Sequence, residues 1–87
     1  MAELSPGPVV TVRYFAGARA AAGVVSEDVA ARTVAELHSR ITAGRDARFA
    51  QIVGASTLMF DGRPLTDDRT ILPAGATVEV LPPFAGG

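Results

Sequence analysis

The sequence predicts one α+β domain, in which a mixed sheet of about five strands packs against one main helix. Its 87 residues leave room for a single small core. The segments 9–15 and 77–81 are rich in β-branched residues and lie near the two ends of the chain. A capped amphipathic helix begins between them, after Thr33. These observations predict that the first and last strands lie side by side in the centre of the sheet, with the helix across one face.

The first strand is predicted over 9–15, where β-branched and aromatic residues dominate. Successive side chains of a strand point to opposite faces, so Val10, Val12 and Tyr14 share one face. We expect this face to point into the core.

Glycine and proline indicate irregular structure on both sides of this strand. Residues 1–8 contain the run Ser-Pro-Gly-Pro and are expected to form a flexible lead-in. Residues 16–23 are small and flanked by glycine, which predicts a loop with room for one helical turn. A weaker second strand is predicted over 24–30, and it should pair with the first strand as a hairpin with a long loop.

The main helix starts with a capping box. The Thr33 hydroxyl can accept a hydrogen bond from the Glu36 amide, and the Glu36 carboxylate can accept one from the Thr33 amide. Gly44 is expected to end the helix. One apolar stripe with helical spacing follows the cap and consists of Val34, Leu37 and Ile41. This face should pack on the sheet.

A second short helix is predicted over 46–53. Its inward-facing residues are expected to be Phe49, Ile52 and Val53. A short strand follows over 57–60.

The last third of the chain predicts a turn, an edge segment and a final strand. Asp61-Gly62 is a strong turn signal. The segment Arg63-Pro64-Leu65 should be a short edge strand, because proline cannot donate to a central ladder. After a turn over 71–75, the alternating segment 77–81 predicts the final strand.

This order of elements is the β-grasp arrangement of ubiquitin-like folds. We therefore expect a β-grasp domain over 9–81 and an extended tail over 82–87.

Composition excludes several classes of function. The chain has no cysteine and no lysine, so it offers no disulfide, thiol nucleophile or Schiff-base amine. Its single histidine, His38, cannot make a zinc site alone, and no metal or bound cofactor is expected. His38 is expected to be a solvated surface residue, and so are Asp67 and Asp68, which follow each other in the sequence. A net charge of −1 argues against a general nucleic-acid binder.

The chain carries no sign of membrane insertion or secretion. No apolar run reaches the roughly 18–20 residues of a membrane span. The first residues lack the pattern of a secretory signal. We expect a cytoplasmic protein without membrane contact.

The segment Pro82-Pro83-Phe84-Ala85-Gly86-Gly87 carries the strongest functional signal. The paired prolines cannot continue a strand ladder, so the tail should leave the sheet as an extended arm. Gly86 and Gly87 have no Cβ, and such an end can enter a tunnel too narrow for other residues. The α-carboxylate of Gly87 is then the one chemically usable group.

Three stretches together resemble a known family. They are VRYFAGAR over 12–19, TVAEL over 33–37 and VLPPFAGG over 80–87. They resemble the first strand and Phe-Ala-x-x-Arg loop, the helix start and the closing Pro-Pro-x-x-Gly-Gly of the MoaD/ThiS sulfur carriers. The resemblance is strongest to the small subunit of molybdopterin synthase, because ThiS-type carriers usually lack the Pro-Pro. The chain departs from the family in a shorter approach to the helix before Thr33 and in Pro64, where the family usually keeps a pairing strand.

The resemblance implies a mechanism and its partners. A ubiquitin-activating-like, MoeB-like enzyme would use ATP to adenylate Gly87, and a rhodanese-like donor would convert the adenylate to a thiocarboxylate. The thiocarboxylate would give its sulfur to cyclic pyranopterin monophosphate inside a heterotetramer with a large, MoaE-like subunit. The chain would be non-catalytic alone and would act as the carrier subunit of a sulfurtransferase complex.

The resemblance also implies residues that contact partners. Phe15, Leu65 and Leu81 match positions that pack against the synthase and activating subunits, and Arg19 matches a basic position that pairs with the activating enzyme. The tail residues expected to share this contact are Pro82, Pro83, Phe84 and Ala85. By strand alternation Phe15 points away from the Val12 face. The alternative is that Phe15 and Leu81 are core residues of adjacent strands and that Arg19 is a solvated loop residue.

Other functions share these features. A carrier for another pathway, such as thiazole or cysteine synthesis, would use the same chemistry with a different acceptor enzyme. A ubiquitin-like modifier would instead be ligated to lysines of other proteins. A non-covalent interaction domain would not need Gly86 and Gly87.

Overall fold

A computed structural model describes residues 7–83. The elements in chain order are β1 (Val9–Tyr14), α1 (Ala16–Ala22), β2 (Ser26–Ala30), α2 (Val34–Thr42), α3 (Ala47–Ala55), β3 (Thr57–Phe60), β4 (Arg63–Pro64) and β5 (Thr77–Leu81). The strands form one five-stranded sheet in the order β2-β1-β5-β3-β4. The predicted α+β class with a mixed sheet is confirmed.

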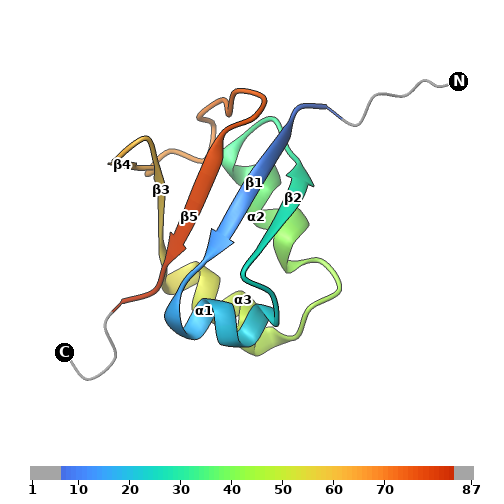
Figure 1. The fold of residues 1–87 in the computed structure, drawn as a ribbon, viewed down its shortest axis with the longest axis vertical. Helices are drawn as coiled ribbons and strands as arrows, with labels where there is room; N and C mark the ends of the chain where they lie inside the picture. The colour runs from blue at the N-terminus through green and yellow to red at the C-terminus, as the bar shows by residue number, and fades with distance from the viewer. Residues whose placement is uncertain (1–6, 84–87) are drawn as a thin grey trace, which may run out of the picture.

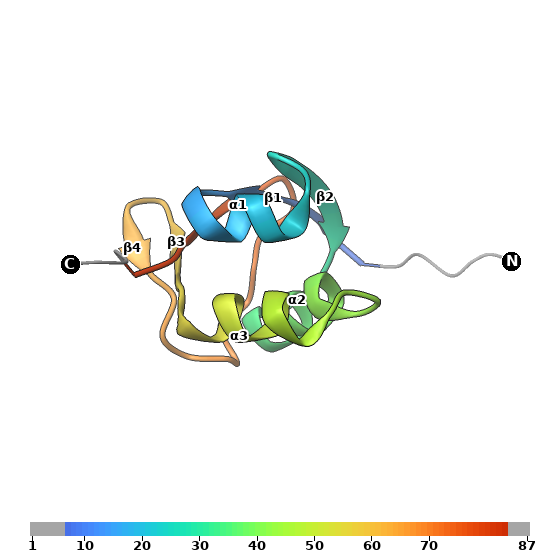
Figure 2. The same ribbon diagram turned by 90° about the horizontal axis from the view of Figure 1, so that it is seen from below.

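The first and last strands lie together in the centre of the sheet, as predicted. β1 and β5 pair in parallel, with Thr11 opposite Thr77 and Tyr14 opposite Val80. All other pairs in the sheet are antiparallel. Figures 1 and 2 show α2 and α3 behind the sheet and α1 at the end toward which β1 and β5 run.

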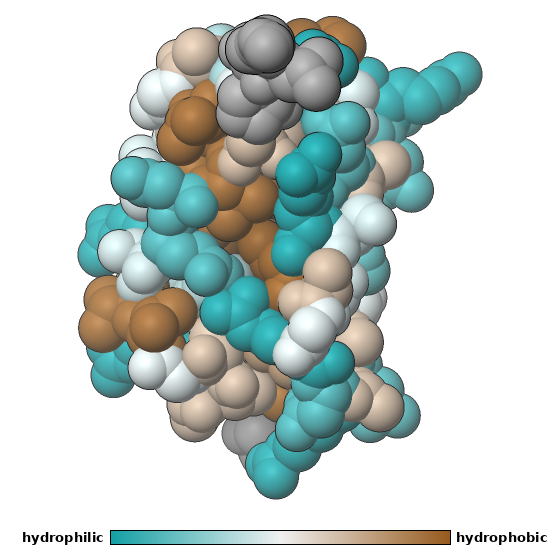
Figure 3. All heavy atoms as spheres, turned by 90° about the vertical axis from the view of Figure 1, so that its right-hand side faces the viewer, coloured by the Kyte–Doolittle hydropathy of each residue, from teal (hydrophilic) through white to brown (hydrophobic). Residues whose placement is uncertain are grey.

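The core lies between the sheet and these helices. β1 and β5 contribute the predicted alternating face, with every second residue buried. The buried apolar residues are Val10, Val12, Tyr14, Ala18, Ala31, Val34, Leu37, Ile41, Phe49, Val53, Leu58, Leu72, Ala76, Val78 and Val80. On the side of β2, the surface shows a strip of apolar atoms between hydrophilic ones (Figure 3).

The prediction of a loop over 16–23 was wrong, because α1 occupies most of it. Alanine has the highest helix propensity, and this segment is largely alanine. Ala18 is fully buried, so the helix also packs on the core. Gly23 ends it in the left-handed region, at φ 79°, and its amide donates to the Arg19 carbonyl. The glycines that predicted a loop are a helix end and a helix residue.

Two further predictions need smaller corrections. β2 begins at Ser26, so Val24 and Val25 precede it and are exposed. The Thr33 hydroxyl accepts from the Glu36 amide at 3.1 Å, as predicted. The Glu36 carboxylate, however, accepts from the Arg32 amide at 2.6 Å and not from Thr33. The second short helix predicted over 46–53 is confirmed as α3, which is as long as α2.

The Asp61-Gly62 turn has the geometry that its sequence predicts. Both residues have positive φ, 54° and 76°, as a type I′ turn requires. Its strands β3 and β4 pair over Met59–Pro64 and Phe60–Arg63. β4 is an edge strand, which is where a proline is tolerated.

A polar network joins β2 to the helices. Arg45 donates to the Glu27 carboxylate at 2.8 and 3.2 Å and to the Ile41 carbonyl at 2.8 Å. The Tyr14 hydroxyl donates to the same carboxylate. The Arg45 guanidinium lies 4.8 Å from the centre of the Phe49 ring. Burial and the adjacent Glu27 raise the pKa of Tyr14. Burial favours a higher pKa for Glu27, but hydrogen bonds from Arg45 and Tyr14 outweigh it and lower that pKa.

Candidate functional site

The carboxyl ends of β1 and β5 meet at one end of the sheet because the two strands are parallel. β5 ends at Leu81, and Pro82 continues the chain from there. β1 ends at Tyr14, and the chain turns at Phe15 into α1. Ala16 takes an unusual positive φ of 49° at this turn. The turn keeps Phe15 at the same end of the sheet as Leu81.

A groove of about 770 Å³ lies at this end of the sheet. The residues that line it come from the β1–α1 turn, from α3 and from the end of β5, and most are apolar. They are Phe15, Ala16, Gly17, Gln51, Ile52, Ala55, Leu81, Pro82 and Pro83. Figure 1 shows β5 running to the end of the molecule where α1 and α3 lie. The tail therefore begins on the wall of an apolar groove.

Charged residues stand beside the Phe15 ring. The guanidinium carbon of Arg13 lies 5.2 Å from the ring centre. Arg13 Nη1 also lies 4.0 Å from a Glu79 carboxylate oxygen, and both side chains are about half exposed. An exposed ion pair contributes little stability, but the cation over the ring contributes about 0.5–1 kcal/mol. The Arg13 guanidinium thus stabilises the Phe15 ring in its position at this end of the sheet.

No protein-family model and no curated protein matches the chain. Solved structures do match. SAMP1 from Haloferax volcanii is 18% identical with a TM-score of 0.76, and the match covers 91% of this chain and 99% of that one. A Pyrococcus furiosus protein assigned as molybdopterin converting factor subunit 1 is 26% identical with a TM-score of 0.68, over 90% of this chain and 100% of that one.

A third match is a complex of subunits 1 and 2 of the molybdopterin-converting factor from Helicobacter pylori. It is 22% identical with a TM-score of 0.69, over 91% of this chain and 99% of that one. The chain has a MoaD/ThiS-like ubiquitin fold. The β-grasp class and the resemblance inferred from the sequence are confirmed.

The MoaD/ThiS-like fold brings four of the predicted partner-contact residues together. Phe15, Leu81, Pro82 and Pro83 all line the groove. Phe15 and Leu81 are half-buried and lie outside the fully buried core, so the core alternative does not describe them. The remaining predicted tail residues, Phe84, Ala85, Gly86 and Gly87, lie outside the described residues. The contact roles themselves stay predictions.

Leu65 and Arg19 do not join this group. Leu65 is half-buried against the core, and its amide donates to the Leu58 carbonyl at 2.7 Å. It lines other cavities, not the groove. Arg19 is exposed on α1, and the groove does not include it. Partner contact by either residue stays a prediction, and for Leu65 it would need a second surface.

Sequence reasoning missed the wall that α3 supplies. Ile52 was expected to face inward with Phe49 and Val53, and it does pack against the core; it is only half-buried, however, and also lines the groove, beside Gln51 and Ala55. Ile52 lies at the edge of the apolar stripe of α3, and this is the one signal that could have found it. Its position next to the tail depends on how α3 crosses the sheet.

Two further properties of the described residues bear on the site. Within residues 7–83, no three His, Asp or Glu side chains lie close enough to hold a metal ion. In the same range, no helix has the length and apolar character that crossing a membrane requires.

Proposed function

We propose that the chain is a sulfur carrier and the small subunit of a molybdopterin synthase. A MoeB-like enzyme adenylates the Gly87 carboxylate with ATP, because a free carboxylate is a poor electrophile. The outer sulfur of a persulfide on a rhodanese-like donor then attacks the acyl carbon, and AMP leaves. A thiol cleaves the resulting acyl disulfide, which leaves a thiocarboxylate on Gly87 and a disulfide on the donor. The thiocarboxylate gives its sulfur to cyclic pyranopterin monophosphate in molybdenum cofactor biosynthesis.

One observation carries this proposal: the Gly-Gly tail begins at a central strand, on the wall of an apolar groove. Residues 84–87 follow Pro83 and span at most about 14 Å when extended. A partner must therefore place its active site within that distance of Pro83. A groove at the base of the tail offers the apolar contact that such close docking needs.

The large-subunit partner is supported by a structural relative. The Helicobacter pylori match is a complex of subunits 1 and 2 of its molybdopterin-converting factor. We propose the same kind of partner for this chain, with a MoaE-like subunit seated over the groove.

Intact-mass spectrometry tests the carrier chemistry. The chain is incubated with ATP, a MoeB-like enzyme and a rhodanese-like sulfur donor. Conversion should raise its mass by the difference between one sulfur and one oxygen atom. The matched control lacks Gly86 and Gly87 and should keep its mass. If the same enzymes convert a known carrier but leave the mass of the full chain unchanged, the carrier proposal is refuted.

The groove is tested by binding to the MoaE-like subunit. Phe15→Ser and Leu81→Ser should each weaken the complex about tenfold or more, because buried apolar anchors dominate interfaces. Ile71→Ser is the control, since Ile71 is 71% exposed and lines none of the cavities described here. Equal affinities for all three variants would mean that the partner binds elsewhere.

A ubiquitin-like modifier is the second candidate, favoured by the match to SAMP1, whose Methanosarcina acetivorans counterpart is described as a small archaeal modifier protein. Cell extracts that hold the activating enzyme would then form covalent adducts with the chain. Adducts that survive denaturing electrophoresis and require Gly87 favour the modifier. A thiocarboxylate without adducts favours a carrier, and sulfur transfer to a purified acceptor enzyme separates molybdopterin synthesis from a thiazole or cysteine pathway.

A further inference from the structure

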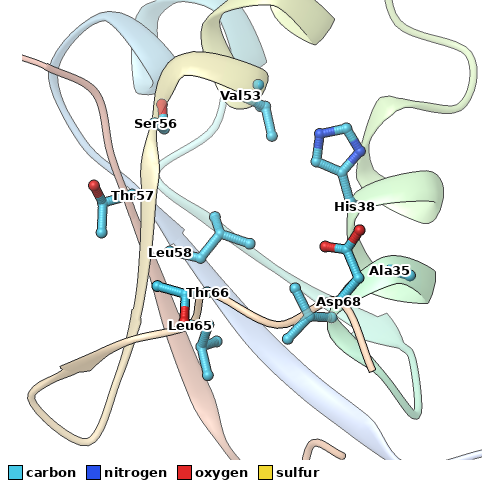
Figure 4. A pocket seen from close by; sticks show the side chains of 11 residues that line it. Ala35, His38, Val53, Ser56, Thr57, Leu58, Leu65, Thr66 and Asp68 are labelled. Carbon is cyan, nitrogen blue, oxygen red and sulfur yellow. The ribbon is translucent and has the colours of Figure 1, made fainter. Parts of the chain in front are cut away.

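A second cavity, of about 430 Å³, lies on the helix side of the sheet (Figure 4). α3 separates it from the groove, because Val53 and Gly54 face the cavity while Ile52 and Ala55 face the groove. Its other walls are α2, the start of β3 and the segment that follows β4. The sulfur-carrier proposal assigns this cavity no chemical role, and Leu65, whose partner contact stays a prediction, is the one predicted contact residue within 7–83 that lines it.

The cavity has an apolar floor. Val34, Val53 and Leu58 are 3%, 2% and 7% exposed, and all three line it. Figure 4 shows Val53 and Leu58 pointing into the open space. The floor can therefore take an aliphatic group without any change in the core.

His38 and Asp68 form the opposite rim. Figure 4 shows the His38 imidazole on α2 and the Asp68 carboxylate on the side of the cavity that faces Leu58. Among the described residues, no hydrogen bond or ion pair involves either side chain. Both were expected to be solvated surface residues, yet His38 is half-buried.

The position of Asp68 is fixed by its backbone. The Ala35 amide donates to the Asp68 carbonyl at 2.9 Å, and the Val34 amide donates to the Thr70 carbonyl at 3.1 Å. These bonds tie the segment to the first turn of α2. The neighbouring Arg69 guanidinium is turned toward Asp67, with Nε 3.3 Å from a carboxylate oxygen. The Asp68 carboxylate is thus held at the rim and is not neutralised by Arg69.

We propose that this cavity binds a basic group on an aliphatic stem, a guanidinium or a primary ammonium as arginine and lysine carry it. The stem would cover Val34, Val53 and Leu58, since such stems bury readily on apolar surface. The head would donate to the Asp68 carboxylate in a charge-assisted hydrogen bond. An anionic head would be repelled by Asp68, and a neutral one would gain only the apolar contact.

A titration of the isotope-labelled full chain followed by NMR tests the proposal. The probes are N-acetyl-arginine-N-methylamide, agmatine and the neutral N-acetyl-norleucine-N-methylamide. Both cations should cause saturable shifts of the Val34, Val53 and Leu58 methyl signals and of the His38 ring signals. The neutral probe should bind at least about fivefold more weakly, because it lacks the charged hydrogen bond.

Two variants isolate the carboxylate. Asp68→Asn should weaken the binding of both cations about fivefold or more. It should still fold, because the Ala35 amide bonds to the backbone carbonyl at this position. Asp61→Asn is the matched control, since it makes the same charge change on the exposed β3–β4 turn and does not line the cavity. It should bind as the unsubstituted chain does.

The probes also distinguish two sources of the basic group. Binding of the acetylated arginine amide supports a side chain of a partner protein, and binding of agmatine alone supports a free amine. The proposal is overturned if neither cation gives saturable shifts up to about 50 mM. It is equally overturned if the neutral probe binds as tightly as the cations. The sulfur-transfer assay does not involve this cavity, so the two proposals can fail separately.

Discussion

Replacing Arg45 with alanine should loosen the junction between β2 and the helices. The change removes two hydrogen bonds to the Glu27 carboxylate, one to the Ile41 carbonyl and the stacking over Phe49. Tyr14 would remain as the hydrogen-bond partner of Glu27. A half-buried carboxylate would then have lost its counter-charge.

The size of the effect follows from these contacts. Hydrogen bonds to a charged group contribute about 1.5–3 kcal/mol, and the stacked cation adds about 0.5–1 kcal/mol. Water screens part of this, since the Arg45 and Glu27 side chains are 23% and 29% exposed. We expect a loss of about 2–3 kcal/mol in the free energy of unfolding. In a domain of this size that lowers Tm by about 10–20 °C.

Thermal unfolding at neutral pH, followed by circular dichroism, measures this loss. Arg69→Ala is the control, because Arg69 also pairs with an aspartate but its side chain is 90% exposed. This control should have the same melting temperature as the unsubstituted chain. If Arg45→Ala melts at the same temperature as Arg69→Ala, the network does not stabilise the packing of β2 against the helices, and the reasoning is wrong.

The same network predicts an acid-dependent loss of stability. Hydrogen bonds from Arg45 and Tyr14 hold the Glu27 pKa below the ordinary value of 4.5, although burial alone would raise it. A group whose pKa is lower in the folded state stabilises the fold fully above its unfolded pKa. That stabilisation is lost as the pH falls through the folded pKa. Glu27→Gln should therefore be less stable at neutral pH and should lose less of its stability on acidification below pH 4.5.

Four further variants test the fold by urea unfolding. Leu37→Ala removes a fully buried residue of α2 and should cost about 2–5 kcal/mol, and a loss under 1 kcal/mol would mean that α2 is not part of the core. Gly62→Ala should lower the free energy of unfolding by about 1 kcal/mol, because Gly62 has a positive φ of 76°. Gly54→Ala in α3 should raise it by about 0.5–1 kcal/mol, because nothing lies within 4 Å of the added Cβ and alanine favours the helix. The opposite order of these two variants would contradict the turn geometry. Thr33→Ala should cost about 1 kcal/mol through the lost helix cap, and no change would show that the bond at 3.1 Å contributes nothing.

Local patterns predicted the parts of the fold that depend on local chemistry. Val10 and Val12 alternate on one face of a strand, and Val78 and Val80 do the same, so burial follows directly from the strand period. The start of α2 likewise follows from Thr33 and the stripe behind it. In each case the residues that set the structure lie within a few positions of one another.

Other parts depend on contacts between distant segments. α1 was missed because its small residues also occur in loops, and burial of Ala18 against the core decides the outcome. Leu65 was grouped with Phe15 by resemblance, but it follows a strand of two residues and packs on the core side of the sheet. The groove forms only where β1, β5 and α3 come together at one end of the molecule. No local sequence pattern determines how these distant segments pack.

Because α3 presents different residues to each cavity, we expect that both can be occupied at the same time. A partner over the groove would contact Ile52 and Ala55, and a basic group in the second cavity would contact Val53. A chain held by one protein at the tail would still offer Asp68 to another. The affinity for N-acetyl-arginine-N-methylamide should therefore be the same with and without a MoaE-like subunit bound. A large loss of affinity in the complex would show that one surface covers both cavities, and the second cavity would then belong to the same interface.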